Sequence, residues 1–214
     1  MHKQFLFFDF DGTLVDSGPG IFYSVRYALE HMGLPPMTDV QLRRFVGPPL
    51  DYSFKTFCGL EQADAERAVK LYREIYRTRG IKMAQLYPGI LQTLQTLHDR
   101  GKTLYVATSK PEPFAKEMLA NMGAAQYFSG IFGATFDGTR HTKEDVLRYA
   151  LNMTGVTDLR ACLMIGDRYY DVEGAQAVGM QTLGVSYGFG NRQELEQAGA
   201  VSIADAPQEI CGLV

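Results

Sequence analysis

Short apolar runs recur along the chain, and segments with helical spacing separate them. The first run, Phe5–Phe8, ends at Asp9 and leads into a glycine-containing loop, as is typical of a buried strand. We expect further strands at Thr103–Ala107, Ile131–Thr135, Cys162–Ile165, Thr182–Val185 and Val201–Ile203. Helical patterns that end near a glycine lie at Glu112–Met122, Lys143–Met153, Asp171–Val178 and Arg192–Ala198. This alternation predicts an α/β fold: a doubly wound parallel sheet with helices on both faces.

Residues 18–85 interrupt the alternation. Three amphipathic helical patterns follow one another here, and no strand-like pattern separates them. The second pattern opens at Thr38, with Gln41 three residues later, which is a capping-box arrangement. We therefore expect an α/β core domain made of residues 1–17 and 86–214, with an all-helical domain of residues 18–85 inserted into it.

The composition excludes some partners. The net charge is -3, and a protein that neutralises nucleic-acid phosphates needs a basic surface, so we expect no nucleic-acid partner. No uncharged apolar run approaches the about 20 residues that a membrane helix needs, so we expect no membrane partner. An acidic protein that binds an anionic substrate must concentrate positive charge locally, through a few cationic side chains or a metal ion.

The cysteines and the N-terminus bear on the compartment. Cys58, Cys162 and Cys211 are far apart and form neither a CxxC pair nor a disulfide framework, so we expect reduced thiols. The segment before Asp9 lacks the long apolar stretch of a signal peptide. Both features predict a cytoplasmic protein.

Polar side chains follow several of the predicted strands. In a doubly wound sheet, ligands bind outside the carboxyl ends of the strands. The residues expected at that edge are Asp9, Asp11, Thr108, Ser109, Lys110, Lys143, Asp167 and Asp171. Taken singly, most have a structural explanation: Asp and Gly favour turns, and Thr, Ser and Asp favour helix starts.

Lys143 and the carboxylates together indicate a metal-assisted site. A cation in the first turn of a helix opposes the helix dipole, so Lys143 is better explained by a nearby anion. Four aspartates at one sheet edge would repel one another unless a cation lies among them. Mg²⁺ prefers oxygen ligands and often bridges carboxylates and a substrate phosphate, whereas no His and Cys cluster suggests zinc.

These segments resemble the four motifs of the haloacid dehalogenase-like phosphatases. Asp9–Asp16 resembles the first motif, Thr108–Lys110 the second, Lys143 the third and Gly166–Asp171 the fourth, in the family's order. The helical insertion is similar to the family's cap domain. Within it, Phe45–Leu50 resembles a cap loop of the branch that contains phosphoglycolate phosphatases and 5′-nucleotidases. Two positions depart from the pattern: Ser109 replaces a frequent Asn, and Glu144 replaces a proline.

The resemblance implies a Mg²⁺-dependent phosphate monoester hydrolase. Asp9 would be the nucleophile and Asp11 the general acid and base. Thr108, Ser109 and Lys143 would bind the phosphate. Asp9, the backbone carbonyl of Asp11, and Asp167 would bind Mg²⁺, and Asp171 would support it directly or through water. Two alternatives remain: a sugar-phosphate mutase similar to β-phosphoglucomutase, and a regulatory module with an inactive site.

The expected substrate is a small phosphate ester, either of the phosphoglycolate or of the nucleoside monophosphate type. Arg44 and Gly47 of the expected cap are candidate substrate-binding residues. Arg44 could equally be a solvated cation at a helix end. We expect a monomer or a weak homodimer.

Overall fold

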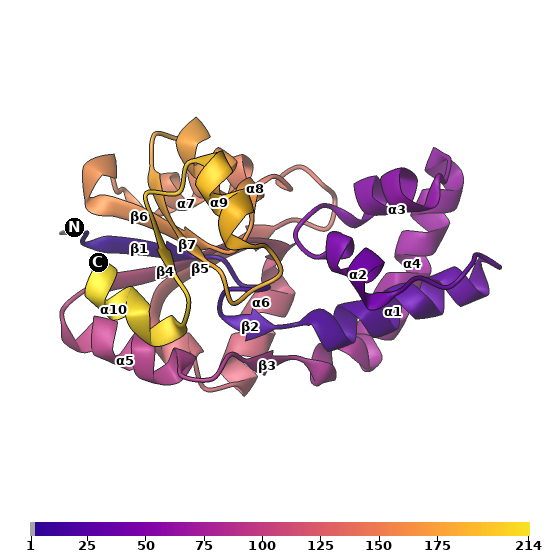
Figure 1. Cartoon of the computed structure of the whole chain (residues 1–214), viewed down its shortest axis with the longest axis horizontal. Coiled ribbons are helices and arrows are strands. Elements are labelled where there is room, and N and C mark those ends of the chain that lie inside the picture. Colours follow the sequence, from indigo (N-terminus) through magenta and orange to yellow (C-terminus); the bar gives the residue numbers. More distant parts are fainter. Residues whose placement is uncertain (1–2) are drawn as a thin grey trace. The chain divides into compact units, whose positions relative to one another are not determined.

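The chain forms two compact units. The computed structural model describes residues 3–214. One unit contains the chain up to Val15 together with Leu86–Val214, and the other contains Asp16–Gln85 (Figure 1). Two short strands, β2 (Val15–Asp16) and β3 (Gln85–Leu86), pair where the chain passes from one unit to the other. That the second unit acts as a cap stays a prediction.

A six-stranded parallel sheet forms the centre of the first unit. Its strands lie in the order β5-β4-β1-β6-β7-β8. Their bounds are β1 Phe5–Phe8, β4 Thr103–Pro111, β5 Phe128–Ala134, β6 Cys162–Gly166, β7 Gln181–Val185 and β8 Ser202–Ala204. Phe8 pairs in parallel register with Val106 of β4 and with Ile165 of β6. The carboxyl ends of these three central strands therefore lie side by side.

Helices cover both faces of this sheet. They are α5 Ile90–Asp99, α6 Glu112–Asn121, α7 Lys143–Thr154, α8 Tyr169–Ala177, α9 Arg192–Ala198 and α10 Ile210–Leu213, with 3-10 turns at Ala125–Tyr127, Leu159–Ala161 and Pro207–Glu209. Helix α10 packs with α5 on one face, and α7, α8 and α9 lie on the opposite face (Figure 1). The predicted doubly wound α/β fold is confirmed.

Helix α7 is held on the sheet by an apolar stripe that includes the position of Lys143. Val146, Leu147 and Ala150 follow Lys143 at helical spacing, and all three are fully buried in a cluster with Met164 of β6. Burial of a large aliphatic side chain stabilises the fold by about 1.5–3 kcal/mol. The packing that attaches α7 to the sheet therefore also fixes the position of Lys143.

The second unit is helical. It contains α1 Gly18–His31, α2 Asp39–Leu42, α3 Leu50–Cys58 and α4 Gln62–Thr78, with 3-10 turns at Arg43–Phe45 and Gly80–Met83. Helices α1 and α4 pack together. A side chain at Gly20 would overlap the backbone carbonyl of Gly80, so the backbones approach closely here. The predicted capping box is confirmed: Thr38 accepts from Gln41 N, and the Gln41 side chain accepts from Thr38 N.

Several elements differ from the sequence prediction. Strand β4 does not end at Ala107 but continues to Pro111, with an irregular register between Thr108 and Pro111. Thr108, Ser109 and Lys110 therefore lie in the last part of the strand rather than after it. Helices α3, α5 and α10 were not predicted. Among the described residues, no helix combines the length and the apolar character that crossing a membrane requires.

Candidate active site

The strand register brings the predicted residues to one edge of the sheet. Asp9 directly follows β1, Thr108 lies near the end of β4, and Asp167 directly follows β6. Thr108 is buried, and its hydroxyl accepts a hydrogen bond from the backbone N–H of Lys110 at 3.2 Å. Ser109 is half-buried. Because β1 pairs in parallel with β4 and with β6, the carboxyl ends of these strands converge, as the sequence predicted.

Three buried carboxylates gather at this edge. One oxygen each of Asp9, Asp167 and Asp171 lies within 4.8 Å of the others. Burial raises the pKa of Asp9 to about 6, and among the other influences Lys143 lowers it while Asp171 raises it. Burial, and then the charges of Asp171 and Asp9, raise the pKa of Asp167 well above its usual value. The cluster is therefore short of positive charge.

The Lys143 ammonium supplies part of this charge. Its Nζ lies 2.7 Å from Asp9 Oδ1 and 2.8 Å from Asp171 Oδ1, and it donates a hydrogen bond to Ala107 O at 2.9 Å. Burial alone would lower the pKa of Lys143, but Asp171 and Asp9 outweigh burial and raise it. Lys143 is the first residue of α7, so the lysine that opposes the helix dipole does meet anions, as the sequence indicated.

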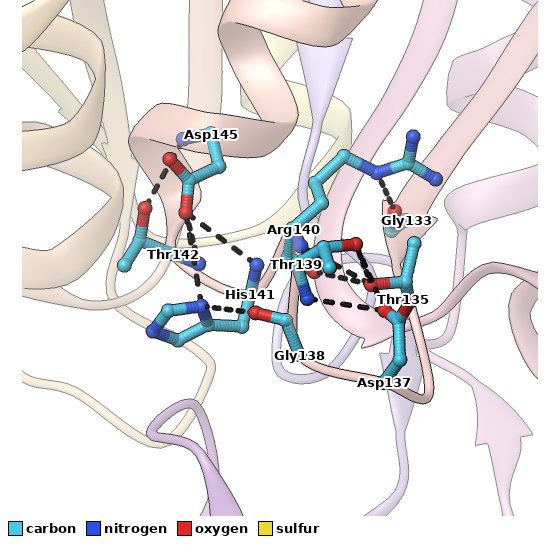
Figure 2. A network of polar contacts seen from close by, with 9 residues as sticks. All are labelled: Gly133, Thr135, Asp137, Gly138, Thr139, Arg140, His141, Thr142 and Asp145. Atoms are coloured by element: carbon cyan, nitrogen blue, oxygen red, sulfur yellow. Dashed lines mark hydrogen bonds and ion pairs between the residues drawn. The ribbon is translucent and has the colours of Figure 1, made fainter.

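The loop before Lys143 is ordered by its own hydrogen bonds (Figure 2). Asp137 Oδ1 accepts from both the N–H and the hydroxyl of Thr139, at 3.1 and 2.8 Å. Thr142 and Asp145 form a capping box, in which each accepts the other's backbone N–H at 3.1 Å. The hydrogen bonds of the preceding loop and the capping box together hold the start of α7, and with it Lys143, in position.

Asp11 has a different environment from the buried cluster. Its carboxylate lies 3.0 and 3.3 Å from Lys110 Nζ. Asp11 does not belong to the three-carboxylate group, so only its backbone carbonyl remains as the predicted metal ligand, and that stays a prediction. Lys110 was expected at this edge from the sequence but without a role.

Asp171 joins the fourth motif to the cluster. Its Oδ2 accepts the backbone N–H of Arg168 at 3.1 Å, which caps α8, while its Oδ1 faces Lys143. Asp171 therefore both caps the start of α8 and belongs to the candidate site, because one carboxylate oxygen accepts the backbone N–H and the other faces Lys143.

The cluster fits a hard divalent cation. It offers three carboxylates against one close ammonium, and all its donors are oxygens, as Mg²⁺ prefers. Within the described chain, Asp9 Oδ1 and Asp171 Oδ1 contact the Lys143 ammonium and have no other hydrogen-bond donor. Buried oxygens with unused acceptor capacity are suitable metal ligands. This buried triad could hold a metal ion.

Arg44 and Gly47 belong to the other unit. The Arg44 guanidinium stacks on the Phe57 ring, 4.1 Å from its centroid. Gly47 has a φ of 105°, which other residues rarely adopt. Their role in substrate binding stays a prediction.

Comparisons with known proteins identify the family. Residues 6–185 match the model of the haloacid dehalogenase-like hydrolases. A 5′-nucleotidase of Pseudomonas aeruginosa is 42% identical over 190 residues, covering 89% of this chain and 86% of the relative. The tyrosine-protein kinase PtkA of Mycobacterium tuberculosis is 39% identical over 203 residues, covering 95% and 69%. The crystal structure of a predicted phosphatase from Clostridium acetobutylicum superposes with a TM-score of 0.95 at 39% identity, covering 100% and 98%.

The chain belongs to the haloacid dehalogenase-like hydrolases. The predicted family is confirmed, and so is the predicted class of enzyme, a phosphoric monoester hydrolase.

Metal binding should release protons. Burial raises the pKa of Asp9 to about 6 and also raises the pKa of Asp167, so a metal ion that binds these carboxylates competes with protons. We expect the affinity for Mg²⁺ to rise from about pH 5 to about pH 7.5, with net proton release near pH 6. Calorimetric titration in two buffers of different ionisation enthalpy measures this release.

The stability of the metal-free protein has the opposite dependence on pH. With its pKa raised from 3.8 to about 6, Asp9 binds more protons in the folded than in the unfolded chain, so its contribution to stability falls as the pH rises through that interval.

For the calorimetric titration, Mg²⁺ binding near pH 6 without proton release would contradict the environment described for Asp9 and Asp167.

Proposed function

We propose that the chain hydrolyses small phosphate monoesters with Mg²⁺ as cofactor, through a phosphoryl group carried on Asp9. The observation that carries this proposal is the buried cluster in which Lys143 pairs with Asp9 and Asp171 beside Asp167. The cluster combines a strand-end carboxylate with a fixed ammonium, which suits a nucleophile next to a phosphate-binding cation.

In the first half of the proposed reaction, an Asp9 carboxylate oxygen attacks phosphorus, and the bond from phosphorus to the ester oxygen breaks. Protonated Asp11 gives its proton to the departing oxygen, which leaves as the alcohol. Lys143 and the Thr108 hydroxyl hold the phosphate oxygens while charge moves among them.

In the second half, Asp11 takes a proton from a water molecule, and the water oxygen attacks phosphorus. The bond to Asp9 breaks, inorganic phosphate forms, and Asp9 and protonated Asp11 are regenerated. Mg²⁺ would be held by Asp9, Asp167, Asp171 and the Asp11 backbone carbonyl. Bound there, it would neutralise part of the phosphate charge.

Nucleoside 5′-monophosphates and phosphoglycolate are the proposed substrate types. The similarity to a protein named 5′-nucleotidase supports the first, and the resemblance of the loop at Phe45–Leu50 supports both. A panel of these esters, together with p-nitrophenyl phosphate, tests the proposal by release of inorganic phosphate. The absence of turnover on every ester in the presence of Mg²⁺ would contradict it and favour a regulatory module.

The relative named a tyrosine-protein kinase supports a second candidate, transfer of a phosphoryl group to protein tyrosine. Incubation with ATP labelled at the γ-phosphate and a tyrosine-containing polypeptide separates the two. Label in the polypeptide favours transfer, and an unlabelled polypeptide together with release of phosphate from the ester panel favours hydrolysis. The mutase alternative predicts interconversion of glucose phosphates without net release of phosphate.

We propose that Arg44 selects among substrates. Its guanidinium is exposed and is supported from one side by Phe57, so it can bind an anionic or aromatic part of an ester. We expect Arg44→Ala to change the ranking of kcat/KM across the ester panel, while turnover of p-nitrophenyl phosphate stays within about threefold of wild type. Arg67→Ala, in an exposed position on α4, is the matched control. An unchanged ranking would leave Arg44 as a solvated surface cation.

A further inference from the structure

The segment that follows β7 contacts both the first and the fourth motif. Tyr187 is half-buried, and its hydroxyl donates to Thr13 O at 2.9 Å. Two residues later, the backbone N–H of Phe189 donates to Asp167 Oδ2 at 2.7 Å. A loop distant in sequence from both motifs therefore binds one of the three clustered carboxylates directly.

Two glycines allow this approach. A Cβ added at Gly188 would overlap Gly12 O and would lie 2.5 Å from Asp167 Cβ. A Cβ added at Gly190 would overlap Asp167 O. Because both obstructing groups include backbone atoms, a side chain at either position must displace the motif loops or the segment itself. Glycine is thus required here by the space beside Asp167.

The same segment also holds the residues that follow Asp167. Glu194, in the first turn of α9, accepts with its Oε1 from Arg168 Nε at 2.8 Å and from Tyr169 N at 3.0 Å. Residues 187–194 therefore contact the fourth motif at the Asp167 carboxylate and at the backbone that leads into α8.

We propose that residues 187–194 form a positioning element that fixes the Asp167 carboxylate for metal binding. Phe189 N–H orients the carboxylate, the glycines admit the loop, and Glu194 holds the neighbouring backbone. This inference rests on the proposed function, because it assumes that the triad binds Mg²⁺. Groups that orient metal ligands in this way commonly change metal affinity by about 10–100-fold when they are removed.

The test measures binding of Mg²⁺ alone, without substrate, by calorimetric titration of the full chain. We expect Gly188→Ala and Gly190→Ala each to raise the Kd for Mg²⁺ by at least about tenfold. Their kcat is not the readout, because a displaced first-motif loop lowers turnover even when the metal site is saturated. Gly212→Ala is the matched control, since a Cβ there meets no atom within 4 Å, and it should bind Mg²⁺ as wild type does.

Glu194 variants keep the test decisive if the glycine variants do not fold. We expect Glu194→Ala to weaken Mg²⁺ binding by about tenfold and Glu194→Gln, which retains an acceptor oxygen, to restore part of the affinity. A wild-type Kd in the folded glycine variants, or in Glu194→Ala if those do not fold, would overturn the positioning role. If the wild-type protein itself does not bind Mg²⁺, the proposed cofactor is wrong instead, so the two failures are distinguishable.

Discussion

Replacement of Asp9 by asparagine should lower kcat by at least about 10⁴-fold and leave the protein folded. The substitution preserves the size of the side chain but removes the charge that attacks phosphorus. It should not lower the melting temperature of the metal-free protein, because Asp9 shares a buried site with two other carboxylates and one close ammonium. Steady-state kinetics and thermal unfolding measure both effects.

The matched control is Asp99→Asn, which makes the same chemical change at an exposed position on α5. It should have wild-type kinetics. If Asp9→Asn kept more than about one hundredth of wild-type kcat, covalent catalysis by Asp9 would be excluded.

Removal of divalent metal should abolish turnover, and added Mg²⁺ should restore it. The reason is the buried triad of Asp9, Asp167 and Asp171, whose mutual repulsion Lys143 alone does not balance. Activity is measured after treatment with EDTA and then during titration with Mg²⁺. Ca²⁺ should bind but not support turnover, because its bonds to oxygen, about 2.3–2.6 Å long, are longer and its coordination is less regular.

Zn²⁺ serves as the control for metal identity. Zinc sites in proteins are typically built from histidine nitrogen and cysteine sulfur, and the triad offers neither donor. Full activity in metal-free buffer would contradict the metal assignment but would leave the proposed nucleophilic role of Asp9 unaffected.

The sequence was sufficient for the α/β alternation because the physical signals are local. Buried parallel strands appear as short apolar runs, and the glycines that end α7 and α9, Gly155 and Gly199, have the positive φ expected at a C-cap. Helix α3 carries an apolar stripe at Leu50, Phe54, Phe57 and Cys58 and could have been predicted, although it is only nine residues long. Helix α5 carries another stripe, at Ile90, Leu94 and Leu97, and could also have been predicted.

The candidate site was predictable as far as strand ends determine it. Parallel pairing places Asp9 and Asp167 side by side, and the position of Lys143 in the first turn of a helix indicated an anion. Two contacts had no comparable signal. The ion pair of Asp11 with Lys110 depends on the irregular end of β4. The hydrogen bond to Asp167 comes from the backbone of Phe189, and a backbone N–H is present at every residue except proline.

The central claim is that a phosphoryl group passes through Asp9, and chemical trapping tests it most directly. Borohydride reduces an acyl phosphate to an alcohol, so protein quenched during turnover with Mg²⁺ and a good ester should contain homoserine in place of Asp9. Mass spectrometry of the peptide that contains the first motif detects this change, and protein reduced without substrate is the control. We predict homoserine at this position alone and only in the presence of substrate. An unreduced Asp9 under conditions of rapid turnover, or homoserine at another aspartate, would contradict the account.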